Sequence, residues 1–138
     1  MERTPVHRST TLYERRTLYE SALTLIRREF ATKLDLQDIA SRLYTSRRQL
    51  QRVFGDAGTS FRTEIRRARM TAAAEILRNH PEVSVREISE AVGYRQPAQF
   101  AKAFRAVFGR APIDYRRMQV FAVSRQREAR RRPGRTRR

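Results

Sequence analysis

Apolar residues recur at spacings of three and four over most of the chain, which is the pattern of helices with one buried face. The clearest stretch is 84–116, where two apolar runs are separated by Gly93 and Tyr94. Gly93 can take the backbone conformation of a tight turn, and Pro97 suits the first position of a second helix, with Gln96 before it as the cap. A helix-turn-helix is therefore predicted. Its apolar positions are Val85, Ile88, Val92, Phe100, Phe104, Val107 and Phe108.

Residues 35–54 carry the same arrangement. Asp35 is a good N-cap for a first helix, Tyr44 and Thr45 form the turn, and Ser46 caps the second helix. This stretch predicts another helix-turn-helix. Its apolar positions are Leu36, Ile39, Ala40, Leu43, Leu50, Val53 and Phe54.

The two stretches form an internal repeat. Ile39 and Ile88 are 49 residues apart, whereas Phe54 and Phe104 are 50 apart. The extra residue of the second copy therefore lies in the turn or at the following cap. Apolar anchors are expected after each copy, at Phe61, Ile65, Ile113 and Tyr115.

Two further helices complete an all-α fold. One is expected from Thr11 or Thr17 to Ala31. The other is a linker helix over residues 61–79, which contains no helix breaker and ends before Pro81. The linker would fix the two copies relative to each other. The predicted organisation is a partly disordered extension (1–17), a first helix-turn-helix unit (18–60), the linker (61–80), a second unit (81–118) and a disordered arginine-rich tail (119–138).

The formal net charge of +17 over 138 residues indicates what kind of partner the protein binds. Nearly all of the positive charge is arginine, since Lys33 and Lys102 are the only lysines. Such an excess indicates an anionic partner, with nucleic acid first and a membrane surface second. Arginine favours nucleic acid, because its planar fork pairs with phosphate and with guanine. The tail over 119–138 alone holds eight arginines against one glutamate, which is typical of a disordered nucleic-acid arm.

Several other classes of protein are disfavoured. The chain has no cysteine, and His7 and His80 are too far apart for a local metal pair, so we expect neither a metal site nor a cofactor. No apolar run approaches the roughly 20 residues of a membrane span, and no signal peptide is evident. No enzyme motif is present. We expect a soluble, cytoplasmic, nucleoid-associated binding protein.

The second helix of each motif exposes polar groups suited to DNA, because a recognition helix places its side chains in the major groove. An arginine can grip guanine and a glutamine can grip adenine, although a solvated basic face that touches only phosphate stays an alternative. The candidates are Arg47, Arg48, Gln51 and Arg52 in the first unit, and Gln96, Ala98, Gln99 and Lys102 in the second, with Arg105 toward the backbone. The first unit offers the stronger hydrogen-bonding chemistry.

The sequence resembles the DNA-binding domain of the AraC/XylS family of bacterial transcription regulators, especially small stand-alone members such as MarA and SoxS. The matching segments are IASRL followed by SRRQLQRVF, RM at 69–70, EISEAVGY, FAKAFRAVFG and the closing PIDYR at 112–116. The resemblance covers residues 18–116.

This resemblance implies seven helices and a monomer bound to two successive major-groove segments about one turn, roughly 34 Å, apart. Its base-reading positions fall on Arg48, Gln51, Arg52, Pro97, Ala98, Gln99, Ala101 and Lys102. The positions expected on the DNA backbone are Ser46, Thr63, Arg66, Ser84, Arg105 and Arg116.

The chain departs from the family pattern in three places. Tyr44 stands where the family usually has glycine, with Gly58 arriving one residue early, and Pro97 and Ala98 replace polar residues. The leading hypothesis is a sequence-specific transcription regulator, with activation as the working expectation, although no residue separates activation from repression. The alternatives are a non-specific or architectural DNA-binding protein and a module that binds RNA polymerase or an acidic partner.

Overall fold

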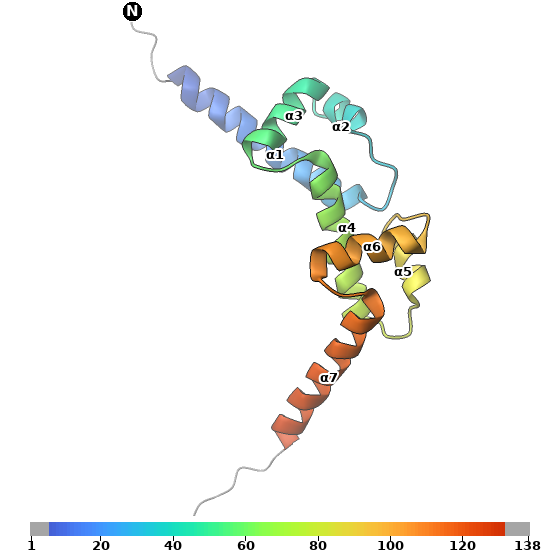
Figure 1. Cartoon of the computed structure of the whole chain (residues 1–138). Coiled ribbons are helices and arrows are strands. Elements are labelled where there is room, and N and C mark those ends of the chain that lie inside the picture. The colour runs from blue at the N-terminus through green and yellow to red at the C-terminus, as the bar shows by residue number, and fades with distance from the viewer. Residues whose placement is uncertain (1–5, 132–138) are drawn as a thin grey trace, which may run out of the picture. The chain divides into compact units, whose positions relative to one another are not determined.

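The structure, a computed structural model, describes the backbone of residues 6–131 and the side chains of residues 12–119 and 122–131. Within this range the chain forms seven helices and no strand, which confirms the all-α prediction (Figure 1). The helices are α1 (Val6–Glu29), α2 (Leu36–Arg42), α3 (Arg47–Asp56), α4 (Phe61–Asn79), α5 (Val85–Ala91), α6 (Pro97–Phe108) and α7 (Pro112–Arg131).

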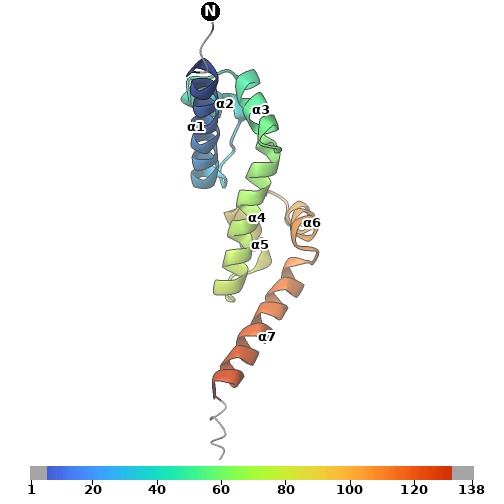
Figure 2. The same cartoon turned by 90° about the vertical axis from the view of Figure 1, so that its left-hand side faces the viewer.

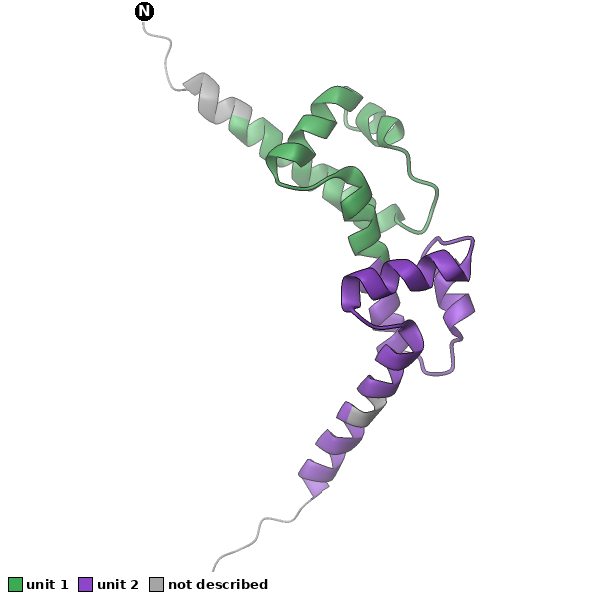
Figure 3. Ribbon diagram, in the orientation of Figure 1, with its two compact units in different colours: residues 1–69 green, residues 70–138 purple. Residues whose placement is uncertain are grey.

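The chain divides into two compact units, and the boundary between Arg69 and Met70 falls inside α4 (Figure 3). α4 covers the same residues as the linker helix that the sequence predicts. Each unit takes about half of this helix. The first unit holds the α2–α3 motif and the second holds the α5–α6 motif.

The core of the first unit is built by α1, α2 and α3, which lie side by side in Figure 2, and by the start of α4. Phe54 at its centre is 1% exposed, and its ring meets those of Tyr19 and Phe61 edge-on at centroid distances of 5.7 and 6.3 Å. Such aromatic pairs stabilise the fold beyond the effect of burying their apolar surface. The buried residues of this cluster are Ala22, Ile26, Leu36, Ile39, Ala40, Leu50 and Phe54.

The core of the second unit joins the end of α4 to α5, α6 and the start of α7. The ring of Phe104, which is fully buried, lies 5.3 Å from Tyr115 and 4.6 Å from Phe108. The buried apolar residues of this unit include Met70, Ala73, Ala74, Leu77, Ile88, Val92, Phe100 and Phe104.

Two residues that the apolar pattern assigns to this core are exposed instead: Val107 at 45% and Ile113 at 53%. Ile113 and Tyr115 lie on opposite sides of α7, since residues two apart on a helix are separated by about 200°. Only Tyr115 can face the core, and Pro112 is the buried residue at the start of α7. Spacing marks the buried face of a helix but not how far the neighbouring helices cover it.

The two turns repeat the same backbone geometry with different residues. Tyr44 has a positive φ of 54°, and Gly93 has a φ of 96°. The amides of Thr45 and Tyr94 then donate to the carbonyl oxygen five residues back, at 2.9 Å in both units. The following cap positions are 50 residues apart, so Arg95 is the extra residue of the second copy.

The terminal helices are longer than the sequence predicts. α1 begins at Val6 rather than at Thr11 or Thr17, and α7 continues to Arg131 although disorder is predicted from residue 119. Neither added segment contains glycine or proline, and Pro133 comes after Arg131 in the sequence, so no backbone signal ends either helix earlier. The predicted disorder over 1–5 and 132–138 lies outside the described residues.

One ion pair ties the end of α1 to α2. Arg42 donates from both terminal nitrogens to the two carboxylate oxygens of Glu29, at 2.9 and 2.6 Å. These hydrogen bonds hold the pKa of Glu29 below its usual value. Over residues 6–131, no helix is long and apolar enough to cross a membrane.

Candidate nucleic-acid interface

Helix α3, the second helix of the first motif, begins where the sequence predicts, because Ser46 caps it. The Ser46 hydroxyl accepts from the amide of Gln49 at 3.1 Å, and its backbone is extended as a cap requires. Thr45 adds a hydrogen bond of 2.8 Å to the Gln49 side chain. The start of α3, and with it the direction of its side chains, is therefore set by local contacts.

The exposed face of α3 carries three arginines and a glutamine. Arg48 and Arg52 are one turn apart and point away from the buried side of the helix, which is formed by Leu50, Val53 and Phe54. None of the three arginines on this face makes an ion pair or a side-chain hydrogen bond within the described part of the chain. The four predicted residues of this face, all exposed, are Arg47, Arg48, Gln51 and Arg52.

Arg52 also forms part of a cleft between α3 and α1. The cleft has a volume of about 200 Å³. Its lining residues are Glu14, Arg15, Leu18, Gln49, Arg52 and Val53. Sequence reasoning did not place α1 beside this face, since no local pattern reports a contact between residues nearly 40 positions apart.

Helix α6, the second helix of the second motif, starts at Pro97, as predicted. Gln96 occupies the cap position with extended backbone, but its side chain makes no capping hydrogen bond. Ala101 is half-buried at the edge of the helix, whereas the other predicted residues project outward. These exposed residues are Gln96, Pro97, Ala98, Gln99, Lys102 and Arg105.

The residues predicted to touch the DNA backbone differ in their present contacts. Arg66 is exposed. Ser84 caps α5 in a reciprocal capping box with Glu87. The Thr63 hydroxyl accepts from Ser60 at 2.9 Å.

Arg116 is the residue of this set whose charged group is already engaged. It is half-buried, and its Nη2 donates to the carbonyl oxygens of Val83 and His80 at 2.5 and 3.3 Å. Arg116 therefore holds the turn that enters α5.

Sequence reasoning also missed a buried acid at the start of α4. Glu64 is 7% exposed, and its Oε1 accepts from Thr59 Oγ1 at 2.7 Å and from Arg67 Nη1 at 2.9 Å. A buried carboxylate needs such partners. Glu64 thus fixes the loop between α3 and α4.

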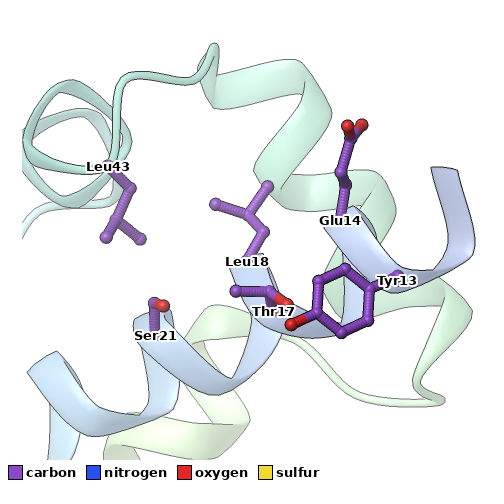
Figure 4. Close-up of a pocket in the computed structure, with 6 residues that line it drawn as sticks. All are labelled: Tyr13, Glu14, Thr17, Leu18, Ser21 and Leu43. Carbon is purple, nitrogen blue, oxygen red and sulfur yellow. The ribbon is translucent and has the colours of Figure 1, made fainter. Parts of the chain in front are cut away.

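A second cleft in the first unit has a different character. It lies between α1 and the end of α2, with a volume of about 280 Å³ (Figure 4). Its lining residues are Tyr13, Glu14, Thr17, Leu18, Ser21 and Leu43. Because none of them is cationic, this surface does not suit phosphate.

Comparison with known families matches residues 39–118 to a family described as a helix-turn-helix domain. The match begins within α2, includes α3 to α6, and ends within α7.

One similar relative is the Msm operon regulatory protein of Streptococcus mutans, which is 33% identical over 94 residues, or 67% of this chain and 34% of the relative. The chain spans about a quarter to a third of the length of the curated relatives that it matches.

Two solved structures share the fold. The C-terminal domain of AraT, a response regulator of Geobacillus stearothermophilus, is 33% identical, with a TM-score of 0.68 over 73% of this chain and 84% of that domain. The DNA-binding domain of AdpA, a global transcriptional factor, was solved in complex with a target DNA; it is 25% identical, with a TM-score of 0.66 over 73% of this chain and 90% of that one.

Proposed function

Because the chain belongs to the AraC/XylS family of helix-turn-helix DNA-binding domains, we propose that it acts in transcription regulation and binds specific DNA sequences through α3 and α6. The observation that carries this proposal is the exposed arginine face of α3, whose donors have no partner among the described residues. In this proposal each recognition helix enters one of two successive major-groove segments.

We propose that α3 supplies most of the sequence discrimination. Arg48 and Arg52 would each donate two hydrogen bonds to guanine O6 and N7, and Gln51 would pair with adenine. Arg47 lies nearer the edge of the face, where base and phosphate are both within its reach.

The second helix has weaker hydrogen-bonding chemistry. Gln96, Gln99 and Lys102 would contact base edges, and Ala98 would pack on a thymine methyl group. Pro97 and Ala101 would add apolar contact. We expect α6 to contribute more to grip than to discrimination.

Phosphate contacts would surround both helices. Arg66 and Arg105 are exposed cations, and the capped helix starts near Ser46, Thr63 and Ser84 offer backbone N–H groups. Arg116 is left out of this proposed set, because its guanidinium is already bonded to main-chain carbonyl oxygens.

A random-duplex selection at near-physiological salt tests the proposal. Arg52→Ala should then cost about 1–3 kcal/mol on the selected duplex and relax the preference at one base pair. Arg78→Ala, an exposed arginine in the last turn of α4 and in none of the proposed contact sets, is the matched control. No enriched motif, or equal losses on selected and scrambled duplexes, would contradict specific reading by α3.

A second candidate, non-specific DNA binding, is favoured by the extra length of α7. Four arginines of its last turns are exposed, and they are Arg125, Arg127, Arg130 and Arg131. If these dominate, deletion of residues 119–138 should abolish most affinity and flatten the salt dependence. If α3 and α6 dominate, the deletion should weaken all duplexes alike and leave the ranking of sequences unchanged.

RNA polymerase as a partner, binding as a monomer, and location in the cytoplasm at the nucleoid stay predictions. Light scattering of the protein on its selected duplex would test the monomer. An affinity for an acidic partner that survives Arg48→Ala and Arg52→Ala would favour the protein-interaction alternative.

A further inference from the structure

Each unit contains one arginine that bonds to the main chain just before its helix-turn-helix. In the first unit, Arg69 of α4 donates from Nε to the carbonyl oxygen of Phe30 at 2.8 Å and from Nη2 to that of Thr32 at 3.4 Å. These carbonyls belong to the loop between α1 and the cap of α2. The first helix of the motif therefore begins at a point that α4 holds.

The second unit has the same device on different residues. Arg116 of α7 donates to Val83 and His80, as described above. The carbonyl oxygen of His80 also accepts from the amide of Val83 at 3.1 Å, so Arg116 binds a closed turn. Val83 directly precedes Ser84, the cap of α5. In both units an arginine on the closing helix grips the entry to the first helix of the motif.

Arginine is the side chain that fits this task. Loop carbonyls have no partner from a helix ladder, and buried ones need a donor. A guanidinium offers five donors in a fixed plane, whereas the ammonium of lysine is a compact group on a flexible stem. Arg69 reaches its two carbonyls from Nε and Nη2, and Arg116 reaches both of its carbonyls from Nη2. The Nε of Arg116 is buried without a partner, so this end of the side chain is shielded from solvent.

In the second unit, the hydrogen bonds of Arg116 link α7 to the turn that enters α5, while α7 also packs against α6. α7 touches α6 through Tyr115, whose ring lies 5.3 Å from that of Phe104, and Arg116, the next residue, holds the entry to α5. We propose that Arg116 and Arg69 are positioning residues, which set the angle at which α6 and α3 leave their turns, and that neither is a phosphate contact. This inference rests on the proposed function for its effect on DNA, but not for its effect on the protein alone.

Lysine substitutions test the inference, because they keep the charge and remove the fork. In the DNA-free full chain, Arg116→Lys should speed amide hydrogen exchange by about tenfold or more in residues 80–92 and leave residues 30–43 unchanged. Arg69→Lys should do the reverse. Arg117→Lys and Arg62→Lys, exposed arginines on the same two helices, are the controls. Unchanged exchange in Arg116→Lys and Arg69→Lys would overturn the proposal.

DNA binding gives the second readout. Arg116→Lys should lower the ratio of affinities for selected and scrambled duplexes by about tenfold, with the affinity for the scrambled duplex unchanged. Arg116→Ala should leave the salt slope unchanged. A slope reduced by about one, with equal losses on both duplexes, would instead identify a phosphate contact and refute the positioning role. If the unaltered chain binds no duplex specifically, the proposed function fails and hydrogen exchange alone decides.

If a lysine variant loses its protection from exchange throughout its unit, the effect is no longer local. A substitution that keeps one of the two hydrogen bonds is then the better test. Arg116→Gln keeps an amide donor that can reach one of the two carbonyls. Faster exchange confined to residues 80–92 in this variant would support the proposal, and exchange equal to that of the unaltered chain would overturn it.

Discussion

At the scale of single residues, Tyr44 stands out, because a fully exposed side chain occupies a backbone conformation that favours glycine. Its φ is 54°, and it is 99% exposed, so no packing offsets the conformation. A left-handed conformation costs an L-residue about 1–2 kcal/mol. The second unit makes the same turn with Gly93, which adopts a positive φ without this strain.

We predict that Tyr44→Gly stabilises the protein by about 1 kcal/mol, since relief of the strain exceeds the extra entropy of glycine in the unfolded chain. Urea denaturation measures the change. Tyr44→Ala keeps the strain and should gain nothing. Equal stabilities of the glycine and alanine variants would show that the turn stores no strain.

The ion pair of Glu29 and Arg42 predicts a dependence of stability on pH. The folded-state pKa of Glu29 lies below its unfolded value, near 4.3. Its contribution is therefore fully present above that value and is lost as the pH falls through the folded pKa. Glu29→Gln should lower the melting temperature at pH 6 and have a smaller effect at pH 3. A difference that stays constant with pH would contradict this linkage.

At the scale of elements, the start of α6 lacks a side-chain cap. Gln96→Asp should accept a hydrogen bond from a first-turn amide and stabilise the fold by about 1 kcal/mol. The same carboxylate would repel phosphate, so affinity should fall on every duplex. Thermal melting and titration on selected and scrambled duplexes check both effects. Gln96→Ala, which removes no cap, should leave stability nearly unchanged; a clear loss would mean that the glutamine does cap.

Local signals explain which elements the sequence predicts. The cap residues Asp35 and Ser46 bond to amides two and three residues away, and both are identified by residue type alone. The bounds of α4 follow from the absence of breakers before Pro81. The contrasting case is α7, where charge suggests disorder but no backbone signal stops the helix before Arg131.

The candidate site is predicted only in part, for the same reason. The exposed row on α3 follows from helical periodicity. The engagement of Arg116 with Val83, 33 positions earlier, leaves no trace in a local pattern. Composition alone treats every arginine as a solvent-facing cation, and only tertiary contacts reveal those that bind the chain itself.

At the scale of the whole molecule, two cores share one helix. Phe61 and Ile65 of α4 pack against the first core, and Met70 and Leu77 are buried in the second unit. We predict that Thr71→Pro, an exposed change in the middle of α4, costs about 3 kcal/mol and splits one unfolding transition into two. Calorimetry would show the split. Thr71→Ala should melt as the unaltered chain does, and a single transition in the proline variant would contradict the coupling.

Shared use of α4 also constrains how such a chain can be divided or extended. α4 follows α3 and holds the entry to α2 through Arg69, and it also precedes α5 as α1 precedes α2. Any cut between the units therefore leaves at least one of them without part of a helix that it needs. The same arrangement limits how a further repeat could be added. The smallest insertion is one repeat of three helices, which is 49 or 50 residues long. The last helix of each repeat then serves as the first helix of the next one.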